Sequence, residues 1–245
     1  ILPSIFAGVR KRGFTTTMAF KSEYLKKVYA NVEKKDPDQP EFLQAVKEVL
    51  ESLEPVIEQR PDLVKAGKVE FKDIEGLTIE NRIACAKAIP DDILAEIKTC
   101  DVLLKGPTET PNGGTMESAN VTLRRELDLY ANVRPVCVPE LGIDWMFYRE
   151  NTEGEYVLGS RGVELPGMAV DFKVTTDLGT KRIAKAAFEY ARNNGKTKVS
   201  IVTKANIMKK TDGKFTAIAH EVAKDYPEIE VEDYYIDIMT ANLLK

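Results

Sequence analysis

Arginines and small polar side chains gather around one predicted helix start, an arrangement that suits a ligand with several carboxylates. A loop over residues 105–114 leads from a predicted strand into a helix that begins at Ser118. Backbone N–H groups at a helix start carry partial positive charge and attract anions. Arginine side chains add charge and bind carboxylates through paired N–H groups. The candidate anion-binding residues are Ser118, Asn120, Arg124, Arg134 and Arg149.

Three further residues offer acid/base or metal chemistry. Lys204 follows an apolar strand at its C-terminal end, where α/β folds bind ligands, and burial or nearby cations could lower the pKa of its amine. Tyr156 is a second candidate for proton transfer. Asp237 supplies a carboxylate of the kind that Mg²⁺ prefers. The pattern alone favours an ordinary, non-catalytic role for each of these residues.

The sequence lacks the main features of several other functional classes. The sequence contains neither G-x-G-x-x-G nor G-x-x-x-x-G-K-[ST], and its one histidine, His220, lies in an amphipathic pattern typical of a structural or solvated residue. A net charge of −4 disfavours nucleic-acid and anionic-membrane surfaces. No apolar run approaches the roughly 18 residues of a membrane span. Three widely spaced cysteines favour reduced thiols, and we therefore expect a cytoplasmic protein.

The elements that position these residues divide into two parts. Residues 19–66 are predicted to form two helices, because apolar residues recur every three or four positions on both sides of the break at 36–40. Pro55 is expected to kink or end the second helix. From Val69 onward, strands and helices alternate, which predicts an α/β sandwich.

The α/β part contains one segment of open interpretation. Residues 155–178 form either a protruding arm or an ordinary surface loop. Elsewhere the hydrophobic pattern defines the elements. The predicted strands are 69–71, 102–104 and 199–203, and the predicted helices are a short one capped by Asp91 or Asp92, then 118–129, 180–193, 211–225 and 236–244.

Six motifs, in this order, resemble the isocitrate/isopropylmalate dehydrogenase family over about residues 68–245. Ser118 and Asn120 resemble the isocitrate branch, because an apolar pocket for an isopropyl group would not favour them. The resemblance implies an incomplete α/β sandwich and metal-dependent oxidative decarboxylation of isocitrate to 2-oxoglutarate. The motifs are Leu103-Leu104-Lys105-Gly106-Pro107, Ser118-Ala119-Asn120-Val121, Leu127-Asp128-Leu129-Tyr130-Ala131-Asn132-Val133-Arg134-Pro135, Arg149-Glu150-Asn151-Thr152-Glu153-Gly154, Lys204-Ala205-Asn206-Ile207-Met208-Lys209 and Asp237-Ile238-Met239-Thr240-Ala241.

The same resemblance implies where the substrate is held. Arg124, Arg134 and Arg149 would bind its carboxylates, and Ser118 and Asn120 would meet the third one. We therefore expect these five side chains to converge on one concave, positively charged site.

The resemblance also implies the chemical roles. Tyr156 would protonate the carbon that loses CO₂, and Lys204, reaching in from a partner subunit, would relay the proton of the substrate hydroxyl. Asp237 would bind Mg²⁺ or Mn²⁺, also across a homodimer with shared sites. Thr110 and Asn206 would contact NAD or NADP. Within one chain, Lys204 and Asp237 should therefore lie away from the arginines.

Outside this part the chain resembles a different family. Residues 22–67 resemble the N-terminal helical segment of glutamate dehydrogenase, most clearly over 40–50. We expect residues 1–18 to be disordered or upstream sequence, 19–66 to be this helical segment and 67–245 to be a partial dehydrogenase domain. Because only Asp237 of the implied metal carboxylates is present, the chain alone is expected to be inactive.

Alternatives stay open at this level. One is a non-catalytic dimerisation or interaction fragment, and another is a related isopropylmalate or homoisocitrate dehydrogenase. A glutamate dehydrogenase is excluded, because that resemblance stops near Gly67, before any catalytic residue of that family. The sequence does not separate NAD from NADP.

Overall fold

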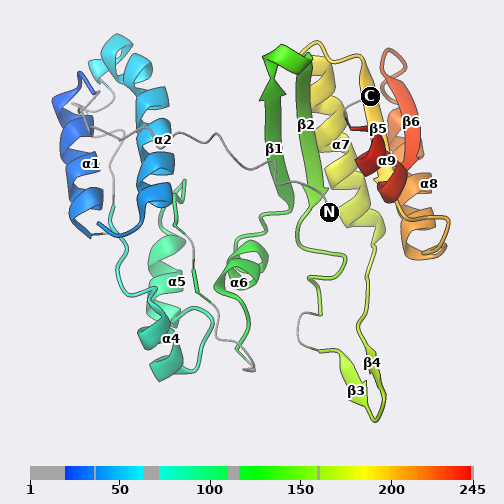
Figure 1. The fold of residues 1–245 in the computed structure, drawn as a ribbon, viewed down its shortest axis with the longest axis horizontal. Coiled ribbons are helices and arrows are strands. Elements are labelled where there is room, and N and C mark those ends of the chain that lie inside the picture. Colours follow the sequence, from blue (N-terminus) through cyan, green and yellow to red (C-terminus); the bar gives the residue numbers. More distant parts are fainter. Residues whose placement is uncertain are drawn as a thin grey trace, which may run out of the picture. The chain divides into compact units, whose positions relative to one another are not determined.

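The computed structural model describes residues 20–35, 37–62, 72–106, 108–109, 116–158 and 161–243. These residues form two compact units (Figure 1). The first draws on Ile1–Glu75 and Val102–Pro107, and the second on Gly76–Asp101 and Thr108–Lys245. The strand expected over residues 69–71 lies outside the described residues.

The first unit is built on a pair of helices, α1 (Glu23–Lys35) and α2 (Pro40–Gln59), which confirms the two predicted helices. Pro55 does not end α2, which continues for four more residues. So near the helix end, the proline removes only one backbone hydrogen bond, and the remaining ones keep the last turn helical. Glu54 of α2 accepts the backbone N–H of Ser22 at 2.8 Å and so fixes the start of α1. The core of the pair is Phe20, Leu25, Tyr29, Val46 and Leu50.

Residues 102–104 were expected to form a strand, and this prediction is wrong. Their backbone is irregular, and Val102 is 86% exposed. A short apolar run does not by itself identify a strand, because a strand also needs a neighbour for its backbone hydrogen bonds. The next residues instead approach α2, where Gly106 lies against the ring of Phe42.

Three short helices open the second unit. They are α4 (Ile79–Cys85), α5 (Asp91–Ile97) and α6 (Ala119–Glu126). The helix expected near residue 91 is present, but Asp91 and Asp92 lie in its first turn, and Pro90 takes the N-cap position. The two carboxylates therefore act on the helix dipole instead of capping the backbone.

A long antiparallel hairpin follows α6 and was not predicted. Strands β1 (Ala131–Val138) and β2 (Ile143–Glu150) are joined by a 3-10 turn, η1 (Pro139–Leu141), and by Gly142, whose φ of 65° suits glycine. The register pairs Asn132 with Arg149. In an antiparallel pair, opposite residues share one face, so this register places polar side chains of both strands together.

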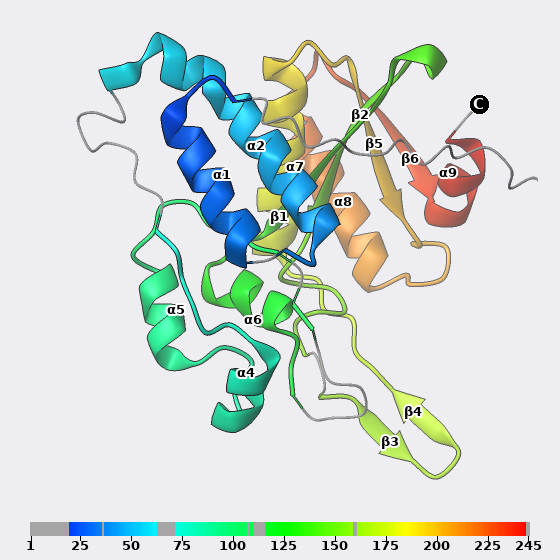
Figure 2. The ribbon, with the colours of Figure 1, turned by 60° about the vertical axis from the view of Figure 1, so that its left-hand side comes forward.

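The remainder of the second unit has α/β architecture, as expected (Figures 1 and 2). Helices α7 and α8 pack against a parallel strand pair through a core that includes Ala184, Phe188, Ile201 and Ala219. The sequence predicted α7, β5, α8 and α9 within a few residues but missed β6, which contains three acidic residues. The elements are α7 (Asp177–Asn193), β5 (Lys198–Thr203), α8 (Thr211–Ala223), β6 (Glu230–Tyr235) and α9 (Ile236–Asn242).

Between β2 and α7 the chain makes a small hairpin, β3 (Val163–Leu165) with β4 (Met168–Val170). It lies inside the segment expected to be an arm or a loop, and Figure 1 shows it extending beyond the end of α7. A bridge between Gly154 and Val174 closes its base. Among the described residues, no helix has the length and apolar character needed to cross a membrane.

Candidate functional site

Two predicted arginines meet at the ring of Tyr156. The guanidinium of Arg124, on α6, lies 5.6 Å from the ring centroid, and that of Arg149, at the end of β2, lies 5.4 Å from it. Cations at this distance are attracted by the electron-rich face of the ring. The fold therefore gathers a helix, a strand and a loop into one positively charged cluster with a phenol at its centre.

Arg134 joins this cluster through two asparagines that sequence reasoning missed. Its Nε donates to Asn132 Oδ1 at 2.9 Å, and Asn132 donates to Asn151 Oδ1 at 3.5 Å. Arg149 donates to the same Asn151 oxygen at 3.3 Å. Asn151 is buried and is itself anchored to the carbonyl of Leu129. The hairpin register could have revealed these partners, but the strands were not recognised.

Ser118 and Asn120 lie at the start of α6, as expected. Ser118 occupies the N-cap position but makes no side-chain capping bond. Asn120 Oδ1 accepts a hydrogen bond from the hydroxyl of Thr108 at 3.2 Å. Both side chains are therefore at a helix start that favours anions. Thr110, the cofactor candidate in the preceding loop, lies outside the described residues.

A carboxylate beside this helix start is neutralised. Glu117 accepts two hydrogen bonds from the guanidinium of Arg125, at 2.9 and 2.6 Å, and a third from Thr122 at 3.0 Å. The bond from Arg125 holds the pKa of Glu117 below its usual value, although burial acts in the opposite direction. An anion near Ser118 consequently faces a paired charge instead of a free carboxylate.

A buried arginine organises the segment before α6. Arg82 of α4 is 1% exposed, and its guanidinium donates to the backbone carbonyls of Ala88 at 2.7 Å, of Glu109 and of Glu117. A buried charge is tolerated when hydrogen bonds satisfy it. Arg82 therefore fixes both flanks of the loop that precedes Ser118, a role with no signal in the sequence.

The loop that carries Tyr156 is docked on the start of α7. Glu153 accepts the backbone N–H of Thr176 at 3.0 Å and also its hydroxyl. Thr176 is the N-cap of α7, where its hydroxyl accepts the N–H of Gly179 at 3.1 Å. A carboxylate at this end of a helix is stabilised by the unpaired N–H groups. The residues before Tyr156 are thus held by α7.

Lys204 and Asp237 form a separate pair at the C-terminal ends of β5 and β6. Lys204 Nζ lies 2.8 Å from Asp237 Oδ2, and this hydrogen bond holds the pKa of Asp237 below its usual value. Within the described ranges, Lys204 has no hydrogen bond or ion pair with Tyr156. The expectation that Lys204 and Asp237 lie away from the arginines within one chain stays a prediction. Asn206, in the turn after Lys204, is exposed.

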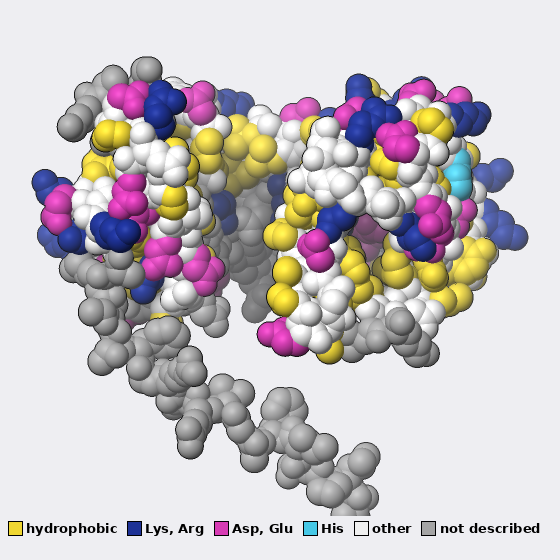
Figure 3. All heavy atoms as spheres, turned by 90° about the horizontal axis from the view of Figure 1, so that it is seen from above, with side chains coloured by type: hydrophobic (Ala, Val, Ile, Leu, Met, Phe, Trp, Pro, Cys, Tyr) yellow, Lys and Arg dark blue, Asp and Glu magenta, His cyan; other side chains and the backbone are white. Residues whose placement is uncertain are grey.

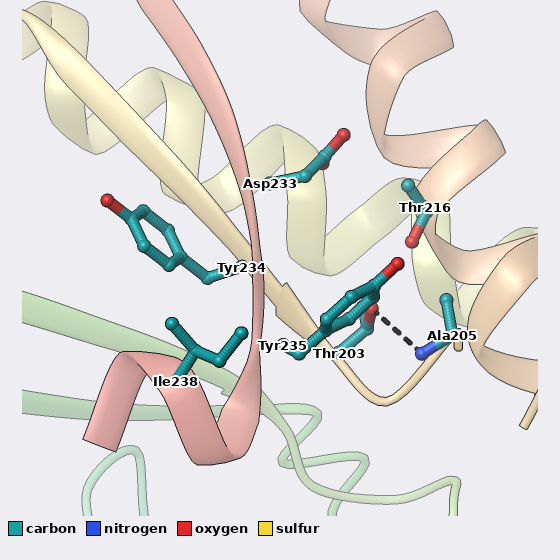
Figure 4. A pocket seen from close by; sticks show the side chains of 7 residues that line it. All are labelled: Thr203, Ala205, Thr216, Asp233, Tyr234, Tyr235 and Ile238. Atoms are coloured by element: carbon teal, nitrogen blue, oxygen red, sulfur yellow. Dashed lines mark hydrogen bonds between the residues drawn. The ribbon is translucent and has the colours of Figure 1, made fainter. Parts of the chain in front are cut away.

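A pocket of about 410 Å³ lies beside this pair. Figure 4 shows its lining around Tyr235, with the hydrogen bond from the Ala205 N–H to the Thr203 hydroxyl at 3.3 Å. Ligands of α/β folds bind at this end of parallel strands. The lining residues are Thr203, Ala205, Thr216, Asp233, Tyr234, Tyr235 and Ile238.

The donor set for a divalent metal is partial. Asp237 offers an exposed carboxylate, which suits one ligand position of Mg²⁺ or Mn²⁺. In the described part of the chain, no group of three or more histidine, cysteine, aspartate or glutamate residues is placed to hold a metal. A metal at Asp237 would also have to displace the amine of Lys204.

The remaining candidates have ordinary environments. The single histidine, cyan in Figure 3, lies at the surface, and its Nε2 is 2.8 Å from Asp233 Oδ2. His220 is thus half-exposed and solvated, as its sequence pattern indicated. The three cysteines, Cys85, Cys100 and Cys137, are unpaired.

Comparison with known proteins gives a consistent family. Residues 32–245 match the model for isocitrate/isopropylmalate dehydrogenase. The mitochondrial NAD isocitrate dehydrogenase regulatory subunit 2 of Arabidopsis thaliana is 45% identical over 157 residues, covering 62% of this chain and 42% of that protein. The chloroplastic 3-isopropylmalate dehydrogenase of Solanum tuberosum is 43% identical over 159 residues, covering 62% and 44%. The chain therefore spans less than half the length of these relatives.

A solved structure agrees with the sequence comparison. The isocitrate dehydrogenase of Methylococcus capsulatus matches with a TM-score of 0.64 and 33% identity, covering 78% of this chain and 60% of that one. The family match begins at residue 32 and so extends into the segment that resembles glutamate dehydrogenase.

The expectation of a cytoplasmic protein is wrong. The relatives that are NAD isocitrate dehydrogenase subunits are named as mitochondrial proteins. Few unpaired cysteines indicate a reducing environment, but they do not distinguish one reducing compartment from another.

Proposed function

Because the chain belongs to the isocitrate/isopropylmalate dehydrogenase family, we propose that the protein carrying it oxidises and decarboxylates isocitrate to 2-oxoglutarate. The proposed cofactors are NAD or NADP together with Mg²⁺ or Mn²⁺. The observation that carries this proposal is the convergence of Arg124 and Arg149 on Tyr156, with Arg134 joined to them through Asn132 and Asn151. Two guanidiniums beside one phenol, with a third joined to them by hydrogen bonds, fit a tricarboxylate that receives a proton.

The arginines bind and orient the substrate. Arg124, Arg134 and Arg149 hold carboxylates through charge-assisted hydrogen bonds. Ser118 and Asn120, at the start of α6, receive the third carboxylate, supported by the Ser118 hydroxyl that makes no capping bond. The paired state of Glu117 removes a repulsive charge from this position.

Tyr156 and Lys204 move protons. The Tyr156 hydroxyl delivers a proton to the carbon that has lost CO₂, and the two flanking guanidiniums stabilise the negative charge that precedes this step. Lys204 relays the proton from the substrate hydroxyl of a partner's site. The Lys204–Asp237 ion pair places a proton-transfer group beside a candidate metal ligand, which fits a site shared between two copies.

The metal and the nicotinamide are supplied from outside the chain. Asp237 would bind Mg²⁺ or Mn²⁺ through its carboxylate, and Thr110 and Asn206 would contact the cofactor. When bound, the metal stabilises negative charge on the substrate oxygens, and the nicotinamide accepts the hydride.

Two alternatives have specific support. A relative that is an isopropylmalate dehydrogenase, at 43% identity, favours a malate-type substrate, and homoisocitrate belongs to the same chemical class. A relative that is a regulatory subunit, at 45% identity, favours a non-catalytic subunit that retains the anion site and the subunit contacts. Inactivity of the chain alone stays a prediction.

One pair of assays separates these possibilities. Isocitrate-dependent reduction of NAD or NADP with Mn²⁺, abolished by Lys204→Met, supports catalysis. Isocitrate binding without turnover supports a non-catalytic subunit, and preferential turnover of 3-isopropylmalate supports the other branch.

The test of substrate binding by Arg149 has a matched control in Arg192, at the C-terminal end of α7. Arg149→Met should weaken isocitrate binding at least about tenfold, since a charged hydrogen bond contributes roughly 1.5–3 kcal/mol. Arg192→Met removes the same charge, but Arg192 pairs with Glu228 at the C-terminal end of α7. The 17 residues of α7 span about 25 Å, so Arg192 lies far from the helix start on which the Tyr156 loop docks. Loss of the Arg192 charge should therefore change isocitrate binding less than about twofold. Equal losses in the two variants would contradict the proposed site.

A further inference from the structure

Asp212, in the first turn of α8, is a buried carboxylate. It is 4% exposed, and no other acidic residue within the described ranges is as deeply buried. Removing a carboxylate from water is costly unless a cation and hydrogen bonds compensate it. The groups that compensate the buried charge of Asp212 should therefore indicate its role.

The first partner of Asp212 is the backbone of Lys204. Asp212 Oδ2 accepts the Lys204 N–H at 2.6 Å. The turn that follows is closed by a bond from the Met208 N–H to the Lys204 carbonyl at 2.8 Å, and the Asp212 N–H donates to the Met208 carbonyl at 3.0 Å. The carboxylate thus holds the residue at the end of β5 against the start of α8 and fixes where the Lys204 side chain begins.

The second partner is Lys173, from the segment after β4. Lys173 Nζ lies 2.7 Å from Asp212 Oδ1 and 3.6 Å from Glu155 Oε1. Its neighbour Val174 exchanges two backbone hydrogen bonds with Gly154, at 2.8 and 3.1 Å. Lys173 therefore contacts the loop that carries Tyr156 immediately before that residue.

We propose that Asp212 and Lys173 are positioning residues that fix the Lys204 turn and the Tyr156 loop relative to each other within one chain. The inference rests on the proposed function for the importance of Lys204 and Tyr156. The contacts form one path, from the Lys204 N–H through Asp212 and Lys173 to Glu155. Proton-transfer groups must be held within about 0.5 Å of their working positions. If Lys204 serves a partner's site, this path also connects two active sites.

A second ion pair nearby provides matched controls. Asp177 of α7 and Lys214 of α8 lie 2.5 Å apart, and their side chains are 64% and 46% exposed. This pair joins the first turns of α7 and α8, and among the described residues it has no hydrogen bond or ion pair with Lys204, Glu155 or Tyr156. Asp177→Asn and Lys214→Met make the same charge changes as Asp212→Asn and Lys173→Met.

The test uses backbone amide resonances and amide hydrogen exchange of the whole chain without substrate. Asp212→Asn replaces a charged acceptor by a neutral one, so the Lys204 amide should exchange about five- to tenfold faster and its resonance should move upfield. The resonances of Glu155 and Tyr156 should move as well. In Asp177→Asn, all three amides should stay as in the unmodified chain.

Lys173→Met tests the path from the other end. It should shift the resonances of Tyr156 and of the Lys204–Met208 turn together, whereas Lys214→Met should shift neither set. Lys173→Arg keeps the charge and should restore both sets of resonances, which a loss of general packing would not explain. If Asp212→Asn alone does not fold, the Asp212→Asn/Lys173→Met double variant removes both charges and leaves no buried ion unpaired.

An unchanged Lys204 amide in Asp212→Asn would overturn the proposal. So would a Lys173→Met spectrum in which only the Tyr156 loop responds. These outcomes do not depend on turnover, so they are distinguishable from failure of the proposed function. Where turnover is measured, Asp212→Asn should lower kcat at least about tenfold and leave the KM for isocitrate within about twofold, because it misplaces Lys204 without touching the arginines.

Discussion

Gly179→Ala should destabilise the second unit, although glycine to alanine in a helix normally does the opposite. Gly179 is the third residue of α7. A methyl group there would lie well under 3.0 Å from the carboxyl group of Glu153. Because that carboxyl group is the end of a flexible side chain, Glu153 would rotate away and lose its two hydrogen bonds to Thr176.

The magnitude follows from two opposing contributions. Losing two hydrogen bonds to a charged acceptor at a helix start costs about 2–3 kcal/mol. The higher helix propensity of alanine returns about 0.5–1 kcal/mol. We therefore expect a net loss of about 1–2.5 kcal/mol, together with a displaced Tyr156 loop.

The assay is denaturant unfolding followed by fluorescence of Trp145, the one tryptophan, which lies on β2 in the second unit. Gly213 is the matched control, because it is also the third residue of its helix and an added Cβ would meet nothing within 4 Å. Gly213→Ala should stabilise by about 0.5–1 kcal/mol. In a Glu153→Ala background, Gly179→Ala should also become stabilising. If Gly179→Ala alone stabilises as Gly213→Ala does, the docking of Glu153 on α7 does not hold the loop.

Two further predictions concern stability. Arg182→Met should cost about 2–3 kcal/mol in Trp145-detected unfolding, because it removes the cation paired with the largely buried Glu150 and the bond to Thr152 at 2.6 Å. Lys98→Met, at an exposed pair with Glu126, should cost less than about 0.5 kcal/mol, and similar costs in the two variants would refute this. Burial, with the bond to Glu189, raises the pKa of Tyr226 from 10.0 to about 12. Between these values the unfolded tyrosine has lost its proton and the folded one has not, so stability falls as pH rises from 10 to 12. Tyr226→Phe should show a shallower fall in unfolding titrations, and an identical slope would contradict the assignment.

The elements that the sequence predicted well are those with long, regular apolar patterns. Helix α7 is of this kind, since its buried face repeats at helical spacing, and strand β5 was recognised as a short apolar run. Strands β1 and β6 were missed, because Pro135 interrupts one and acidic residues dominate the other. An edge strand tolerates such residues, since one side of it needs no partner.

The residues of the candidate site divide in the same way, into those that a sequence motif indicates and those that only contacts in the fold reveal. Motif order pointed to Arg124, Arg149 and Tyr156, and the structure brings these three together. The residues that hold them were not visible in the sequence. Arg82 contacts carbonyls far along the chain, and Asp212 meets Lys173 only after the fold has formed. Such partners depend on register and packing, which no local pattern encodes.

The most direct test of the arginine site is a titration of the chain with isocitrate, observed at the Nε–H resonances of Arg124 and Arg149. Both resonances should shift together with those of Tyr156, and 3-isopropylmalate should bind at least about tenfold more weakly, because its isopropyl group cannot pair with Ser118 and Asn120. Isocitrate that shifts neither arginine, or that shifts them only as much as it shifts Arg192, would contradict the account.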